Sequence, residues 1–136
     1  MTDRALHATF TWAGGTHRFA LPMEETSGLP QRHGVNDPHP RLRRLLTGHW
    51  TVADVSGTIR AGLVGGKAYR ALSPALESVI ADHVLKRPLA ESVPLAKAIL
   101  LVALFGIPAE MAGRPVDAAT VADAATEAHL NALEPA

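Results

Sequence analysis

The chain has 136 residues, of which 47% are hydrophobic and 19% are charged, and its formal net charge is zero. This length and composition suit one globular domain, and with only 4% aromatic residues the core must consist mainly of Leu, Val, Ile and Ala, as in packed helices. The absence of cysteine excludes disulfides, cysteine-based zinc sites and cysteine nucleophiles. Because the N-terminus is polar and the longest apolar run, residues 98–105, is too short to span a bilayer, we expect a cytoplasmic protein without membrane contacts.

Charge is unevenly distributed along the chain. Residues 31–70 contain seven Arg or Lys against two Asp, a balance of +5, whereas residues 107–136 contain one Arg against five Asp or Glu, a balance of −4. The two segments can pair within the fold, or each can steer a partner protein. Solvated faces of ordinary helices are the simpler explanation, since most surface charge contributes little.

The N-terminal pattern predicts a β-hairpin. Residues 8–12 alternate apolar and polar side chains, a second short run follows at residues 17–21, and Gly14-Gly15 can supply the positive φ angles of a two-residue turn. The predicted cross-strand pairs are Trp12–His17, Phe10–Phe19 and Ala8–Leu21. An isolated hairpin is only marginally stable, so we expect its apolar face to lie on helices.

Residues 22–40 contain four prolines and two glycines, which predicts a loop over the surface. Helical segments follow at residues 41–47, 52–64, 74–86, 89–105 and 118–133. Beyond Lys97 the fourth segment is apolar on every side, so it should be the central, most buried helix; it tolerates Pro94 only in its first turn. The patterns together predict a small α+β fold, mainly α with an N-terminal β-hairpin, in a compact domain of about four to five helices.

The segment at residues 52–64 has the clearest helix signals. Thr51 is a candidate N-cap, with Asp54 in the capping-box position. The expected buried stripe, spaced by 3, 4 and 4 residues, is Val52, Val55, Ile59 and Leu63. Gly65-Gly66 should end the helix, with Gly65 at the left-handed C-cap, because glycine adopts that conformation at low cost.

No pattern in the sequence predicts catalysis, a metal or a cofactor. The seven histidines form no H-E-x-x-H or His-x-His motif, and no serine has a G-x-S-x-G setting. Residues 62–67 resemble part of a phosphate-binding loop, but Ala61 and Ala68 stand where glycine and Ser or Thr are required. We therefore expect a non-enzymatic protein with no catalytic, cofactor-binding or metal-binding residues.

A helix-turn-helix around Gly65-Gly66 would instead indicate a DNA-binding regulator. Its connection, residues 65–72, is longer than the usual three or four residues. The second helix begins with Ala75 and Glu77, where recognition helices present donors to base edges. Because the net charge is also zero, nucleic acid is not expected as a partner, and this is the least favoured hypothesis.

A series of short motifs carries a family resemblance. The motifs are Gly14-Gly15, a Leu/Arg segment at residues 41–46, Gly48-His49-Trp50, Asp54-Val55, G-L-x-G-G at residues 62–66, Pro88-Leu89, and an apolar segment at residues 98–106 that ends in glycine. In order and spacing the series resembles the small tail-assembly chaperones of gene transfer agents and tailed phages, which are also labelled tail-tube proteins. The family usually continues with a helix near residues 22–34, where this chain has Gly28 and Pro30.

The resemblance implies a tail-chaperone-like helical domain with an N-terminal hairpin at residues 6–107. Residues 108–136 lie outside the resemblance, and their Ala-rich composition predicts a C-terminal extension that is helical or partly disordered. It implies binding of the tape-measure protein during tail morphogenesis, with tail-tube subunits as further partners. A structural, tail-tube-associated role is the alternative. The candidate partner-binding residues are Arg41, Arg43, Arg44 and Trp50, with the arginines aiding encounter with an apolar client helix. The sequence leaves the client segment and homo-oligomerisation open.

Overall fold

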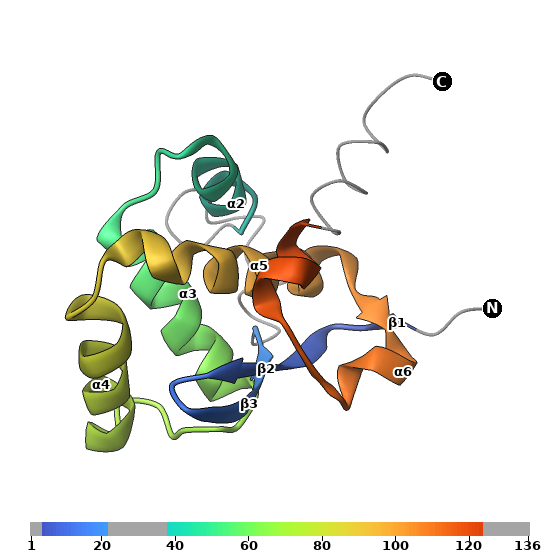
Figure 1. Cartoon of the computed structure of the whole chain (residues 1–136), viewed down its shortest axis with the longest axis horizontal. Helices are drawn as coiled ribbons and strands as arrows, with labels where there is room; N and C mark the ends of the chain where they lie inside the picture. The colour runs from blue at the N-terminus through green and yellow to red at the C-terminus, as the bar shows by residue number, and fades with distance from the viewer. Residues whose placement is uncertain (1–3, 22–37, 124–136) are drawn as a thin grey trace, which may run out of the picture.

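The computed structural model describes residues 4–21 and 38–123, so residues 22–37 of the predicted loop and most of the last predicted helix lie outside the described residues. The loop prediction is wrong for residues 38–40, which form the first turn of the helix Pro38–Thr47. The described chain is mainly helical, with an N-terminal hairpin in a small three-stranded sheet and four helices of seven residues or more. The predicted fold class is therefore confirmed (Figure 1). In chain order the elements are β1 (Arg4–Ala5), β2 (His7–Trp12), β3 (Gly15–Ala20), α2 (Pro38–Thr47), α3 (Val52–Gly65), α4 (Pro74–Ile80), the π-helical turn η1 (Ala81–Leu85), the 3-10 helix η2 (Leu89–Ser92), α5 (Val93–Phe105), β4 (Ile107–Pro108), α6 (Ala109–Ala112) and β5 (Pro115–Val116).

The hairpin of β2 and β3 forms as predicted, but the predicted register is wrong by two residues. The observed pairs are Trp12–Gly15, Phe10–His17 and Ala8–Phe19. The turn is Ala13-Gly14, whose φ angles of 54° and 79° are both positive, as a type I′ turn requires. Because a shift of two residues keeps each side chain on its face, the aromatic residues still meet as diagonal neighbours, with 5.7 Å between the ring centroids of Phe10 and Phe19.

The N-terminus of α3 has the predicted capping box. The Asp54 amide donates to Thr51 Oγ1 at 3.1 Å, and the Thr51 amide donates to Asp54 Oδ2 at 3.0 Å. In the stripe of α3 that was predicted to be buried, Val55, Ile59 and Leu63 are fully buried. Val52, however, is 54% exposed, so its predicted burial is wrong. The buried stripe therefore begins one turn later than predicted, at Val55.

The helix α3 ends at Gly65, one residue later than predicted, and its C-terminus forms a Schellman motif. The Ala68 amide donates to the Leu63 carbonyl at 2.9 Å, and the Lys67 amide donates to the Val64 carbonyl at 3.0 Å. The left-handed residue is Lys67, with φ 65°, whereas Gly66 has φ −79° and Gly65 lies within the helix. The left-handed C-cap predicted for Gly65 is therefore wrong.

Two glycines near the C-terminus of α3 allow the hairpin to lie directly on this helix. A Cβ atom on Gly66 would lie 2.0 Å from the backbone carbonyl oxygen of Arg18, in β3. A Cβ atom on Gly62 would lie 3.2 Å from the side chains of Ile99, in α5, and Phe19, in β3. Residues four apart share a helix face, so the two glycines form a flat strip on which β3 and α5 pack.

The central helix is α5, as the sequence predicts. Nine of its residues are buried, including Leu100 at 1% exposure, and Pro94 stands in its first turn. It crosses between α2 and α3, and contacts the hairpin (Figure 1). The helix α4 continues into η1, and together they bury Leu76, Ile80 and Val84 against this core.

Residues beyond α5 complete both sheets. β4 pairs antiparallel with β1, and β5 lies parallel to β2, giving the strand order β3-β2-β5. Residues 118–123 are helical, and the Thr120 amide donates to Asp117 Oδ2 at 3.0 Å at the start of this segment. Val121 and Ala122 are buried in the main core.

Candidate partner-binding surface

Arg44, one of the four candidate residues, is held by a carboxylate. Its Nε and Nη2 atoms donate to the two oxygens of Asp54 at 2.7 and 2.6 Å, a bidentate pair that joins α2 to the N-terminus of α3. Asp54 is only 3% exposed and also accepts from the Thr51 amide. The hydrogen bonds from Arg44, and then those from Thr51, hold the pKa of the Asp54 carboxyl below its usual value, although burial opposes this.

Arg41 joins the same cluster. Its Nη1 donates to Thr58 Oγ1 at 3.3 Å, and its Nε lies 3.8 Å from Asp54 Oδ1. Thr58 in turn donates to the Asp54 carbonyl at 2.6 Å and is fully buried. Two of the three candidate arginines therefore converge on one carboxylate and tie two helices together, so both side chains are held by the fold.

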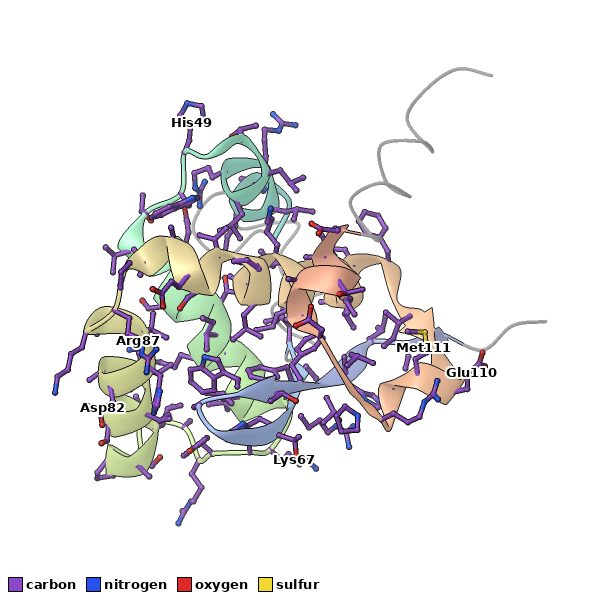
Figure 2. All side chains as sticks on the ribbon, in the orientation of Figure 1. His49, Lys67, Asp82, Arg87, Glu110 and Met111 are labelled. Carbon is purple, nitrogen blue, oxygen red and sulfur yellow. The ribbon has the colours of Figure 1, made fainter. Side chains whose placement is uncertain are left out.

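The other two candidates have different surroundings. Arg43 is exposed, on a different side of α2 from the Asp54 cluster. Trp50 is half-buried and packs against the core between α2 and α3. His49, next to Trp50, lies at the extreme edge of the molecule (Figure 2). Of the four candidates, the structure thus leaves Arg43 with the most available side chain.

A cluster of aromatic rings joins the hairpin to η1, and of its contacts the sequence pattern predicted only the proximity of Trp12 to His17. The ring of Trp12 lies edge-on to those of His17 and His83, with centroid distances of 5.6 and 5.8 Å, and His17 stacks on Tyr69 at 6.2 Å. Burial, and then the nearby His83, lower the pKa of His17. The signal for this cluster was the alternation of aromatic residues on both strands, but the contact of Trp12 with η1 depends on tertiary packing.

Beside this cluster lies a pocket of about 250 Å³ with mixed chemistry. Trp12, His83, Arg87 and Glu91 line it together with the hairpin turn. Arg87 and Glu91 form an ion pair at 4.0 Å across one turn of chain. Within residues 4–21 and 38–123, no three His, Cys, Asp or Glu side chains gather as a metal site would require. Over the same residues no single helix is long and apolar enough to cross a membrane. The helical segments Pro74–Leu85 and Leu89–Phe105 reach that length and hydrophobicity only when taken together, and the chain bends by 115° between them.

Comparison with known protein families gives one match. The family model described as phage tail tube protein, GTA-gp10, matches residues 5–106. The chain belongs to this family. Neither the search of curated proteins nor that of solved structures returned a match. The predicted resemblance to the tail-assembly chaperone family is thereby confirmed.

The motifs that point to the GTA-gp10 family have structural roles in this member. Gly48, with φ 82°, ends α2, and Gly106, with φ 77°, ends α5. Asp54 anchors Arg44, and Gly62 and Gly66 admit the hairpin. Each of these residues therefore has an explanation within the fold.

Proposed function

We propose that this protein is a non-enzymatic tail-assembly chaperone that binds the tape-measure protein while a phage-like tail is built in the cytoplasm of the bacterial host. Membership of the GTA-gp10 family over residues 5–106 carries this proposal. Tail-tube subunits are the second proposed partner. We assign the binding unit to residues 6–107 and regard residues 108–136 as an extension, whose helical residues 118–123 place Val121 and Ala122 in the same core.

Within this proposal, α2 and the segment that follows it face the client. The exposed side chain of Arg43 attracts the client during encounter. Arg41 and Arg44 stabilise this surface through Asp54, and Trp50 stabilises it by packing on the core. Steering by an exposed charge acts mainly on the association rate and weakens with salt. Affinity comes instead from burial of apolar side chains of the client.

Co-expression with the tape-measure protein of the same phage-like gene cluster tests the proposal. We expect the tape-measure protein to become soluble and to co-purify as a complex. Arg43→Glu should slow association at low salt and leave thermal melting unchanged. Arg114→Glu, an equal charge change at another exposed arginine, is the matched control and should associate at the wild-type rate. A triple exchange of all three arginines is unsuitable, because it would also break the Asp54 cluster.

The family description, phage tail tube protein, supports a second candidate, a structural role in the tail. Mature particles distinguish the two functions. A chaperone should be absent from purified particles, whereas a tube-associated protein should be present at stoichiometric amounts and should form rings when isolated. Failure to form a complex with the tape-measure protein, together with rings in mature particles, would replace the chaperone proposal with the structural one.

A further inference from the structure

The connection between α3 and α4 contains a leucine that the fold does not explain. Leu72 is 88% exposed, more than any other large apolar side chain of the described residues. Its φ angle is 61°, in the left-handed region, where the Cβ atom of an L-residue crowds the following carbonyl oxygen. The Ser73 amide donates to the Arg70 carbonyl at 3.2 Å and closes a four-residue turn in which Leu72 is the third residue. Turns with positive φ at this position favour glycine or asparagine.

The rest of this connection presents positive charge beside an apolar pocket. Lys67 and Arg70 are exposed, and in the part of the chain that the structure describes no carboxylate lies within 4.0 Å of either charged group. The acidic residue at the start of α4, Glu77, is bound to Arg60 at 3.0 Å. Six residues of this part of the chain line an open pocket of about 440 Å³: Val64, Lys67, Ala68, Tyr69, Arg70 and Ala71.

The shape of the connection is fixed at both ends. Lys67, at φ 65°, belongs to the Schellman motif of α3, and Ser73 caps α4 by accepting from the Leu76 amide at 3.2 Å. Tyr69 stacks on His17 of the hairpin. The connection runs along the edge of the molecule, where Lys67 projects outward (Figure 2). Leu72 is thus displayed on a defined turn, and backbone strain of this kind is concentrated at functional positions.

We infer that residues 64–72 form a docking surface for an acidic amphipathic helix of a partner protein, with Leu72 as the apolar anchor and Lys67 and Arg70 as the charged flanks. A leucine side chain fits between residues one turn apart on the apolar face of a helix. The same helix places apolar side chains in the pocket and its flanking carboxylates against Lys67 and Arg70. Charge complementarity favours this partner over a basic helix. The inference does not depend on the identity of the proposed client.

Two designed peptides of about 20 residues, long enough to form a helix, test this surface by fluorescence anisotropy. Both carry the same leucine stripe; one is flanked by Glu and the other by Lys. We expect the Glu peptide to bind and the Lys peptide to bind at least about tenfold more weakly, a difference of about 1.4 kcal/mol. Lys67→Glu with Arg70→Glu should reverse this preference.

Leu72→Gly separates binding from folding. Glycine removes the anchor and also relieves the left-handed strain, so the variant should melt at a higher temperature than wild type while losing at least about tenfold in affinity for the Glu peptide. Leu85→Ser is a control that removes a different exposed leucine, which is 50% exposed at the end of η1. This variant should bind the Glu peptide as wild type does. Arg114→Glu controls for the loss of positive charge.

Three results would overturn the inference: no binding of the Glu peptide, equal binding of both peptides, or binding that Leu72→Gly leaves unchanged. Concentration-dependent self-association that Leu72→Gly abolishes would assign the surface to a second copy of this chain instead. The tape-measure complex should survive Leu72→Gly, because the proposed function places that client on α2 and the segment that follows it.

Discussion

The contact between α3 and β3 makes Gly66→Ala the most informative single change in this fold. The added Cβ would stand 2.0 Å from the Arg18 carbonyl oxygen, and real Cβ atoms essentially never approach a heavy atom within 3.0 Å. The strand must therefore move by roughly 1 Å, because the obstructing atom belongs to the backbone and no rotamer change can remove it. The same strand carries Phe19, which is 1% exposed, so the displacement would disturb the aromatic core.

The magnitude follows from two opposing terms. Overpacking typically costs about 1–3 kcal/mol, and a backbone obstacle places this site at the upper end. Alanine recovers up to about 1 kcal/mol of helix propensity relative to glycine. We therefore expect a net loss of about 2–3 kcal/mol in the free energy of unfolding, which for a chain of this size lowers Tm by about 10 °C.

The chain offers a matched control on the same helix. A Cβ on Gly57 would meet nothing within 4 Å, so Gly57→Ala should stabilise the protein by about 0.5–1 kcal/mol. Gly62→Ala should fall between the two, because its neighbours at 3.2 Å are side chains that can shift. Urea and thermal denaturation of the three variants measure the order directly. A Gly66→Ala variant as stable as Gly57→Ala would refute the close packing of hairpin and helix.

Three further predictions concern charged residues. Arg44→Met should lower the free energy of unfolding by about 1–2 kcal/mol. This loss is at the lower end of the values for charge-assisted hydrogen bonds, because the Arg44 side chain is 38% exposed. A double-mutant cycle with Asp54→Asn checks that the loss belongs to this pair. Because the pKa values of Asp54, His17 and His7 are all lowered in the fold, the unfolded chain binds more protons, so stability should fall as pH drops below 6.5 through the two histidines, and again below 3.8 through Asp54. In urea denaturation across this range, the first step should be smaller in His17→Gln than in wild type and absent when His7→Gln is added; a step that persists in the double variant would refute its assignment to these two histidines. Lys67→Gly should raise stability by about 0.5–1 kcal/mol, because glycine adopts φ 65° without strain; a lower Tm would mean that the lysine side chain supports the Schellman motif.

Local signals in the sequence were sufficient for most of the fold. The capping box at Thr51 and Asp54 and the continuous apolar surface of α5 each depend on neighbours within one or two turns, and each was predicted correctly. The hairpin register failed because Gly14-Gly15 offers two possible turns, and alanine at position 13 can take a positive φ when the strands pack well. Turn chemistry alone does not distinguish registers that keep the same face.

Roles that depend on contacts distant in sequence were not predictable. The sequence places Gly65-Gly66 at the end of a helix, but only the packed hairpin shows that Gly66 is required by the Arg18 backbone. Likewise, the three arginines of α2 look equivalent in the sequence, yet Asp54, ten residues beyond Arg44, selects two of them. In the folded protein Arg41 and Arg44 contact Asp54, whereas Arg43 is exposed to solvent.

The same distinction separates residues that stabilise this protein from residues available to a partner. The Asp54 cluster, the glycine strip and the buried face of α5 are each accounted for by contacts within the chain, so changes there act on binding only through the fold. Leu72 has the opposite properties: its backbone conformation costs free energy, its side chain is almost fully exposed, and no described contact offsets either. A variant that is more stable but binds less well is the signature of a residue with a binding role. Gly66→Ala and Leu72→Gly should therefore shift stability in opposite directions, and only the second should weaken the acidic helix while the protein remains fully folded.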